Sequence, residues 1–118
     1  MSQRDKPADV EDWQGPPSPH ERADILARME ALRDEIDRID EVLVKLLSSR
    51  AGCALKIGEL KKRLTMEIYQ PTREQQVLQH VRQVNPGPLD SDAIARLFER
   101  IIDEARRLER VSQEKEGE

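Results

Sequence analysis

The sequence contains few of the residues from which disulfides, metal sites and aromatic cores are built. Aromatic residues make up 3% of the 118 residues, and there are five glycines, two histidines and one cysteine. The single Cys53 excludes an internal disulfide, and His20 and His80 show no ligand-like spacing, so no metal site is predicted. No long apolar run occurs, which argues against a signal peptide or a membrane span and favours a cytoplasmic location by default.

The charge and the length of the chain exclude further classes of protein. Charged residues make up 37% of the chain, and 20 cations face 24 anions for a net charge of -4, which argues against a nucleic-acid partner. The length allows one domain at most. Leu, Ile, Arg, Glu and Asp dominate, as in long helices, so the predicted fold class is all-α.

The longest predicted helix runs from about residue 20 to 65. Ser18 is its candidate N-cap, with Pro19 in the first turn and Glu21 three residues after the cap. Steps of four and three residues, the heptad pattern, define its inward positions. These are Ile25, Met29, Leu32, Ile36, Ile39, Leu43, Leu46, Arg50, Cys53, Ile57, Leu60 and Leu64. Such a helix would be about 65–70 Å long, and nothing else in the chain could cover it, so a homodimer is predicted.

A short and a medium helix should follow. Pro71 ends the first helical pattern, and Thr72 with Gln75 forms a candidate capping box for a second helix that stops at "NPGP". Ser91 or Asp90 would cap a third helix, whose apolar stripe ends near residue 108. The predicted organisation is a disordered leader over 1–19, a helical domain over 20–110 and a frayed polar tail over 111–118.

Arg50 occupies an inward position of the first helix, where an unpaired guanidinium is costly. An anion should therefore meet it, either an acidic side chain such as Asp103 or Glu109, or an anionic ligand. On periodicity alone the internal ion pair is slightly favoured. Arg33 and Lys61 lie beside the inward row, where each alone could simply extend into solvent. Arg33 is about 25 Å from Arg50 along the helix, too far to share one small ligand within one chain.

Four segments, in order, carry a recognisable pattern: "LRDEIDRIDEVLVKLLSSR", "IGELK", "IYQPTRE" and "LFERIIDEARRLE". Together they resemble the all-helical class of chorismate mutases, over roughly residues 32–109. The resemblance implies an intertwined dimer of three-helix chains with two active sites. Arg33 would be donated to the partner's site, Arg50 would grip a substrate carboxylate, Arg73 would frame the site, and Glu74 would accept a hydrogen bond from the ring hydroxyl.

The same resemblance implies a reaction and its remaining residues. The substrate would be chorismate, a dicarboxylate, rearranged to prephenate in aromatic amino acid biosynthesis without a cofactor. Lys61 would contact a carboxylate and the ether oxygen, which Glu109 would approach from the third helix. Gln70 stands where relatives often have Asp. Ala105 stands where they often have Ser, which removes a hydroxyl contact worth about 1 kcal/mol.

Two sets of alternatives stay open. Since a carboxylic acid donates a hydrogen bond only when protonated, Glu109 is predicted to be held neutral and activity to favour mildly acidic conditions. Otherwise Glu109 is a solvated helix-end residue paired with Arg106 or Arg110. The whole protein could instead be an isochorismate-pyruvate lyase on the same scaffold, or a non-catalytic helical dimer or regulatory module. Residues 1–19, with Trp13, are a candidate docking segment for another enzyme of the aromatic pathway.

Overall fold

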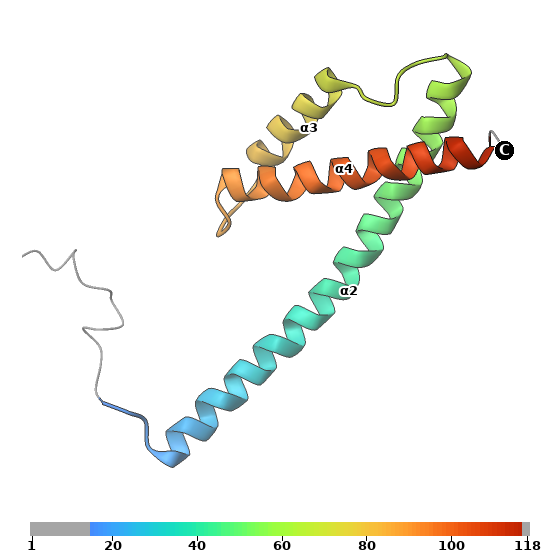
Figure 1. The fold of residues 1–118 in the computed structure, drawn as a ribbon. Coiled ribbons are helices and arrows are strands. Elements are labelled where there is room, and N and C mark those ends of the chain that lie inside the picture. Colours follow the sequence, from blue (N-terminus) through green and yellow to red (C-terminus); the bar gives the residue numbers. More distant parts are fainter. Residues whose placement is uncertain (1–14, 117–118) are drawn as a thin grey trace, which may run out of the picture. The chain divides into compact units, whose positions relative to one another are not determined.

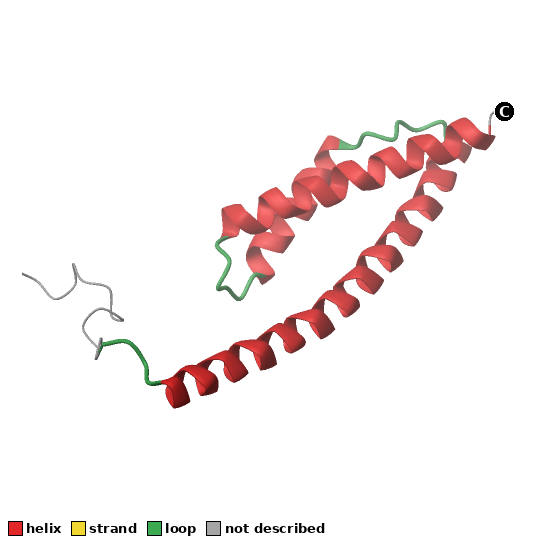
Figure 2. Cartoon of the chain, turned by 60° about the horizontal axis from the view of Figure 1, so that its bottom comes forward, coloured by secondary structure: helices red, strands yellow, loops and turns green. Residues whose placement is uncertain are grey.

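The computed structural model describes residues 15–116, and over that range the chain is all-helical, with no strand (Figures 1 and 2). The order is α2 (Pro19–Arg63), α3 (Pro71–Val84) and α4 (Ser91–Glu116). This confirms the predicted sequence of a long, a short and a medium helix. Residues 1–14, including Trp13 and most of the predicted leader, lie outside the described residues.

The start of α2 has the predicted capping box. The backbone N–H of Glu21 donates to Ser18 Oγ at 3.1 Å, and the Ser18 N–H donates to Glu21 Oε2 at 3.3 Å. These two bonds satisfy backbone donors that have no partner inside the helix. The prediction from Ser18, Pro19 and Glu21 is therefore confirmed.

The end of α2 is a Schellman turn in which a non-glycine residue takes the left-handed position. Thr65 has φ 54°, the Met66 N–H donates to the Lys61 carbonyl at 2.8 Å, and the Thr65 N–H donates to the Lys62 carbonyl at 3.1 Å. Lys61, Lys62 and Arg63 also place positive charge at the carbonyl end of the helix. The chain thus leaves the helix sharply and turns back toward it.

The boundaries of α3 and α4 correct two predictions. Helix α3 begins with Pro71 at its first position and Gln70 as N-cap, without a side-chain capping bond, so the predicted box of Thr72 and Gln75 is wrong. Proline is favoured there because the first N–H of a helix needs no intrahelical acceptor. Of the two candidate caps for α4, Asp90 is the one used, since its Oδ1 accepts the Ala93 N–H at 2.7 Å. The predicted tail beyond residue 110 is also wrong, because α4 continues to Glu116.

The chain divides into two structural units, residues 1–42 and residues 43–118. The described part of the first is the start of α2 with its cap, and its apolar side chains are exposed, for example Leu32 at 60% and Ile36 at 53%. In the second unit α3 and α4 lie side by side (Figures 1 and 2), and their buried apolar residues are Val81, Ala95 and Ile102. Gly58 of α2 is also buried.

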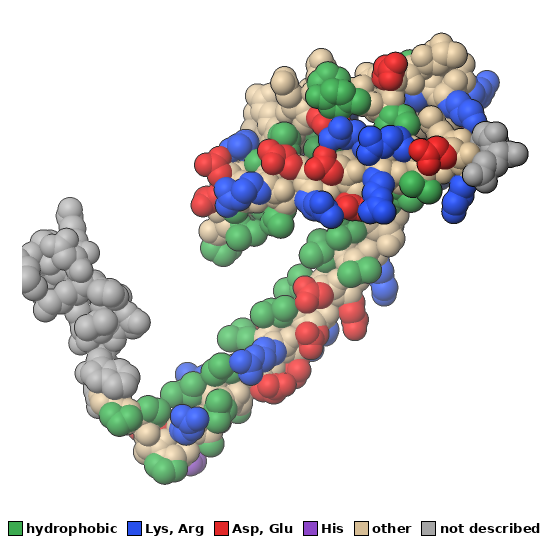
Figure 3. Space-filling view, in the orientation of Figure 1, with side chains coloured by type: hydrophobic (Ala, Val, Ile, Leu, Met, Phe, Trp, Pro, Cys, Tyr) green, Lys and Arg blue, Asp and Glu red, His purple; other side chains and the backbone are tan. Residues whose placement is uncertain are grey.

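Much of the apolar surface of α2 is uncovered in the single chain. Leu46 and Leu60, both predicted inward positions, are 61% and 55% exposed, and hydrophobic side chains follow the helix in the space-filling view (Figure 3). A helix in water rarely leaves such a row without a covering partner. No helix among residues 15–116 is long and apolar enough to cross a membrane.

Candidate functional site

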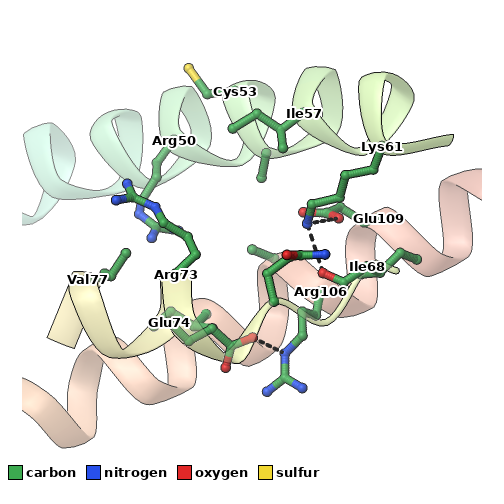
Figure 4. A pocket seen from close by; sticks show the side chains of 14 residues that line it. Arg50, Cys53, Ile57, Lys61, Ile68, Arg73, Glu74, Val77, Arg106 and Glu109 are labelled. Atoms are coloured by element: carbon green, nitrogen blue, oxygen red, sulfur yellow. Dashed lines mark hydrogen bonds and ion pairs between the residues drawn. The ribbon is translucent and has the colours of Figure 1, made fainter. Parts of the chain in front are cut away.

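One cavity of about 270 Å³ in the second unit collects most of the predicted site residues. Helix α2, the loop after it, α3 and α4 all contribute side chains to its wall (Figure 4). Seven of the eight predicted residues line it: Arg50, Lys61, Gln70, Arg73, Glu74, Ala105 and Glu109. The eighth, Arg33, belongs to the first unit, where its Nη1 lies 3.9 Å from Glu30 Oε2.

Lys61 is held at the cavity wall by two contacts. Its Nζ donates to the Ile68 carbonyl at 2.8 Å and to Glu109 Oε2 at 3.2 Å. Both side chains are largely buried, Lys61 being 14% and Glu109 7% exposed. Two fixed acceptors leave an ammonium, which has three donors, one N–H for a ligand. The alternative of a solvated Glu109 paired with Arg106 or Arg110 is therefore wrong.

Gly58 allows Glu109 to come this close to α2. A Cβ added at Gly58 would stand 3.1 Å from Glu109 Cγ and 3.5 Å from its Cβ and Cδ. About one turn further along α4, Gln113 Nε2 donates to the Gly58 carbonyl at 3.3 Å. The missing side chain is thus what lets α2 and α4 approach at the point where the buried ion pair forms. Gln113 lies in the part of α4 that the sequence did not predict.

Arg50 and Arg73 have no carboxylate partner among residues 15–116. The acids predicted for Arg50 are engaged elsewhere, Glu109 by Lys61 and Asp103 by Arg106, so the predicted internal ion pair is wrong. Arg50 from α2 and Arg73 from α3 extend toward the same end of the cavity (Figure 4). Arg50 is half-buried, where a guanidinium without an anion is unfavourable, and the exposed Arg73 adds a second positive charge beside it. This end of the cavity therefore favours a negatively charged group.

The remaining charges come from Glu74 and Arg106, whose Oε2 and Nε lie 3.2 Å apart. Four cationic side chains and two carboxylates therefore line the cavity, an excess of two positive charges. Sequence reasoning named Arg106 only as a partner for Glu109 and missed it as a site residue. The available signal was its position three residues before Glu109, on the same side of the helix.

The rest of the wall is neutral or apolar. Gln70 uses its side-chain amide to donate to the Glu67 carbonyl at 2.8 Å, so it braces the loop before α3. Ala105 presents only a methyl group, and the apolar floor includes Ile57, Val77 and Ile102. Among the described residues no group of three or more His, Cys, Asp or Glu side chains could hold a metal ion. The arrangement suits recognition of charge and shape in a small organic anion.

A second, larger hollow of about 600 Å³ lies between residues 44–51 of α2 and residues 100–111 of α4. Its wall is mostly apolar, with Val44, Leu47, Ile101, Leu108 and Val111. Its charged lining residues are Arg50, Arg100, Glu104 and Arg107, and Glu104 Oε1 lies 2.9 Å from Arg100 Nη2. Of the eight predicted site residues it contains only Arg50 and Ala105. We therefore assign the candidate site to the smaller cavity.

Helical architecture and a cavity with an excess of positive charge together define an all-α chain with a candidate site for an organic anion. Comparison with known proteins gives the family: residues 32–110 match the model for chorismate mutase type II, and the chain belongs to that family. The resemblance stated from the four sequence segments is confirmed.

Curated relatives show the same relationship. The bifunctional chorismate mutase/prephenate dehydratase of Pseudomonas aeruginosa is 41% identical over 87 residues, which are 70% of this chain and 24% of that protein. The protein of the same name from Neisseria gonorrhoeae is 42% identical over 78 residues, 66% of this chain and 21% of its own length. The chain thus spans about a quarter of these relatives.

Solved structures match over nearly their whole length. Chorismate mutase from Thermus thermophilus is 36% identical with a TM-score of 0.69, covering 70% of this chain and 94% of that one. Chorismate mutase from Helicobacter pylori, solved in complex with prephenate, is 30% identical with a TM-score of 0.69, covering 75% and 96%.

Proposed function

We propose that this protein is a chorismate mutase, which converts chorismate to prephenate by an intramolecular Claisen rearrangement. The observation that carries this proposal is the cavity with two excess positive charges, in which Arg50 and Arg73 have no carboxylate partner among the described residues. Chorismate carries two carboxylates, so its charge complements that excess. The mutase from Thermus thermophilus is matched over 94% of its chain, which favours mutase activity over the dehydratase activity of the longer relatives.

Each polar group of the substrate has a matching group in the wall. Arg50 grips one carboxylate, because a guanidinium binds a carboxylate through two parallel hydrogen bonds and fixes its orientation. Arg73 frames the same end of the cavity. Glu74, from the first turn of α3, accepts the hydrogen bond of the ring hydroxyl. Lys61 serves the second carboxylate and the ether oxygen with the N–H that Ile68 and Glu109 leave unused.

The reaction needs positioning and electrostatics rather than proton transfer. The ether C–O bond breaks while a new C–C bond forms within the same molecule, so no leaving group, cofactor or general base is required. Holding the flexible dianion in a compact, chair-like conformer lowers the entropic part of the barrier. Negative charge develops on the ether oxygen, where Lys61 stabilises it. Glu109 approaches the same oxygen and holds the Lys61 ammonium in place.

The direct test supplies purified protein with chorismate and with isochorismate in separate reactions and identifies the products by chromatography. Prephenate from chorismate is expected, and Lys61→Ala should stay folded while losing turnover. Salicylate and pyruvate from isochorismate would instead identify a lyase on the same scaffold. Neither product, from a protein with helical circular dichroism, would refute an enzymatic function and support the binding-module alternative.

The site also needs a second copy of the chain in this proposal. The uncovered apolar row of α2 and the apolar hollow of about 600 Å³ beside α4 give a homodimer the surface it requires. Arg33 is about 25 Å from Arg50 along α2, so it serves its own cavity poorly. We infer that Arg33 is donated to the cavity of the partner subunit and completes the grip on the dianion.

Mixing two inactive variants tests this donation. Arg33→Ala and Lys61→Ala should each be inactive alone, but a mixed dimer contains one intact site, because each chain supplies what the other lacks. Random pairing after joint refolding should restore about a quarter of wild-type activity. The control mixture, Arg50→Ala with Lys61→Ala, should restore nothing, because both residues belong to the same subunit's site. Equal restoration in both mixtures, or none in the first, would refute the donation.

A further inference from the structure

Arg106 lines the cavity although the sequence did not predict it as a site residue, and its guanidinium makes three separate contacts. It lies on α4, three residues before Glu109, and is 28% exposed. Its guanidinium contacts three different segments of the second unit: α3, the loop before α3, and the preceding turn of α4. A single cation held from three directions has a defined position.

The three tethers are chemically distinct. Nε lies 3.2 Å from Glu74 Oε2, Nη2 donates to Asp103 Oδ1, and the guanidinium carbon stands 5.0 Å from the centre of the Tyr69 ring. Contact with an aromatic face within about 6 Å is attractive for a cation. The ring and Asp103 fix where the guanidinium lies, so Glu74 contacts a group whose own place is already set.

The two carboxylate oxygens of Glu74 have different surroundings. Oε2 faces Arg106, while Oε1 has no hydrogen-bond partner among the described residues, and Glu74 lines the cavity (Figure 4). Arg106 Nε is buried and has no hydrogen-bond acceptor of good geometry, although Glu74 Oε2 lies 3.2 Å away. A small movement of the Glu74 carboxylate would align this contact.

We propose that Arg106 is a positioning residue, which orients Glu74 so that its free oxygen accepts the hydrogen bond of the substrate's ring hydroxyl. This inference rests on the proposed mutase function and goes beyond it by assigning a role outside the predicted site residues. Arg106 acts on the substrate only through Glu74. Removing it should therefore have no further effect once Glu74 can no longer act as a charged acceptor.

A double-mutant cycle measures this dependence. The variants are Arg106→Met, Glu74→Gln and the pair, with KM and kcat for chorismate determined for each. Arg106→Met should raise KM about tenfold with kcat within about threefold of wild type, since the hydroxyl contact is present before and during the reaction. The pair should equal Glu74→Gln alone, because contacts that act in series are not additive.

Matched variants separate this role from a general effect on folding. Arg110→Met, one turn further along α4 at an exposed position, should leave KM and kcat unchanged. Asp103→Asn, which removes one tether but keeps the arginine, should raise KM about threefold, and only when Glu74 is present. It provides the test if Arg106→Met unfolds, as judged by circular dichroism and thermal melting.

The outcomes distinguish this inference from the proposed function. A wild-type chain that makes no prephenate would refute both. An active chain in which the losses of Arg106→Met and Glu74→Gln multiply would refute the positioning role, and so would an unchanged KM in Arg106→Met. Multiplying losses would show that Arg106 acts independently of Glu74.

Discussion

Gly58→Ala is the substitution for which the structure makes the sharpest prediction. The new methyl group would stand 3.1 Å from Glu109 Cγ, closer than ordinary carbon contacts, so Glu109 must shift by a few tenths of an ångström. Glu109 accepts the hydrogen bond that holds Lys61 at the cavity, at 3.2 Å. The shift should therefore move both groups that face the ether oxygen in the proposed reaction.

The free-energy terms can be estimated separately. Alanine is favoured over glycine inside a helix by about 0.8–1 kcal/mol, whereas overpacking a buried contact costs about 1–3 kcal/mol. Gly58→Ala should thus destabilise the fold by about 0–2 kcal/mol. Gly52→Ala is the matched control, because it lies in the same helix with nothing within 4 Å of its added Cβ. Gly52→Ala should stabilise the fold only by the helix preference of alanine over glycine, and it should raise the melting temperature by about 3–8 °C.

Thermal melting at one protein concentration and steady-state kinetics with chorismate check both variants. Gly52→Ala should keep wild-type kcat, while Gly58→Ala should lose about tenfold, since small misplacements near a reacting bond are costly. In a Glu109→Ala background, where Cγ is absent, Gly58→Ala should stabilise as much as Gly52→Ala does. Equal stabilisation by both glycine substitutions in the wild-type background, with full activity, would show that the close approach constrains nothing.

Three further predictions concern individual charges. Lys61→Ala should lower kcat by about 10²–10³-fold while the circular dichroism spectrum stays helical; a smaller loss would mean that Lys61 does not stabilise the ether oxygen. Glu109→Gln should lower kcat, because an amide oxygen accepts a hydrogen bond from the Lys61 ammonium less strongly than a carboxylate does; an unchanged kcat would show that the Ile68 carbonyl alone holds Lys61 in place. Arg82 donates a hydrogen bond to Asp92 at 2.7 Å, and this bond together with the arginine's charge holds the pKa of Asp92 below its ordinary value. The pair therefore stabilises the fold at pH values above the pKa that Asp92 has in the unfolded chain. This stabilisation is lost as the pH falls through the lower pKa of the folded state. Arg82→Met should accordingly lower the melting temperature at neutral pH and match wild type in strong acid; a difference that persists in acid would point to packing instead.

Local signals predicted the helices well because the physics that starts and stops a helix is local. Ser18 and Glu21 cap α2 as their spacing indicates, whereas α3 begins at Pro71 with Gln70 as its N-cap and not with the predicted box of Thr72 and Gln75. The end of α4 was predicted too early, since the apolar stripe stops near residue 108. What extends the helix is a contact with α2, the bond from Gln113 to the Gly58 carbonyl, 55 residues away in sequence.

Pairing of charges could not be predicted in the same way. Glu109 has Arg106 three residues before it, and helix spacing alone makes that arginine an acceptable partner. Burial decides otherwise: the Glu109 side chain is 7% exposed and faces α2, so Lys61 is the cation it meets. Arg106 pairs with Glu74 instead and contacts the Tyr69 ring.

The sequence by itself determined the helical class and the three helices, because residue type, periodicity and caps act over a few turns. The seven residues that line one cavity were named through the resemblance of four segments to the chorismate mutases, and not through periodicity. Only the tertiary structure decided which carboxylate neutralises which cation. That choice depends on side chains brought within hydrogen-bond reach from distant parts of the chain, and on the one glycine whose missing Cβ lets α2 and α4 approach. The same packing leaves Arg50 and Arg73 without carboxylate partners among residues 15–116, and this is the basis for proposing a dianionic substrate.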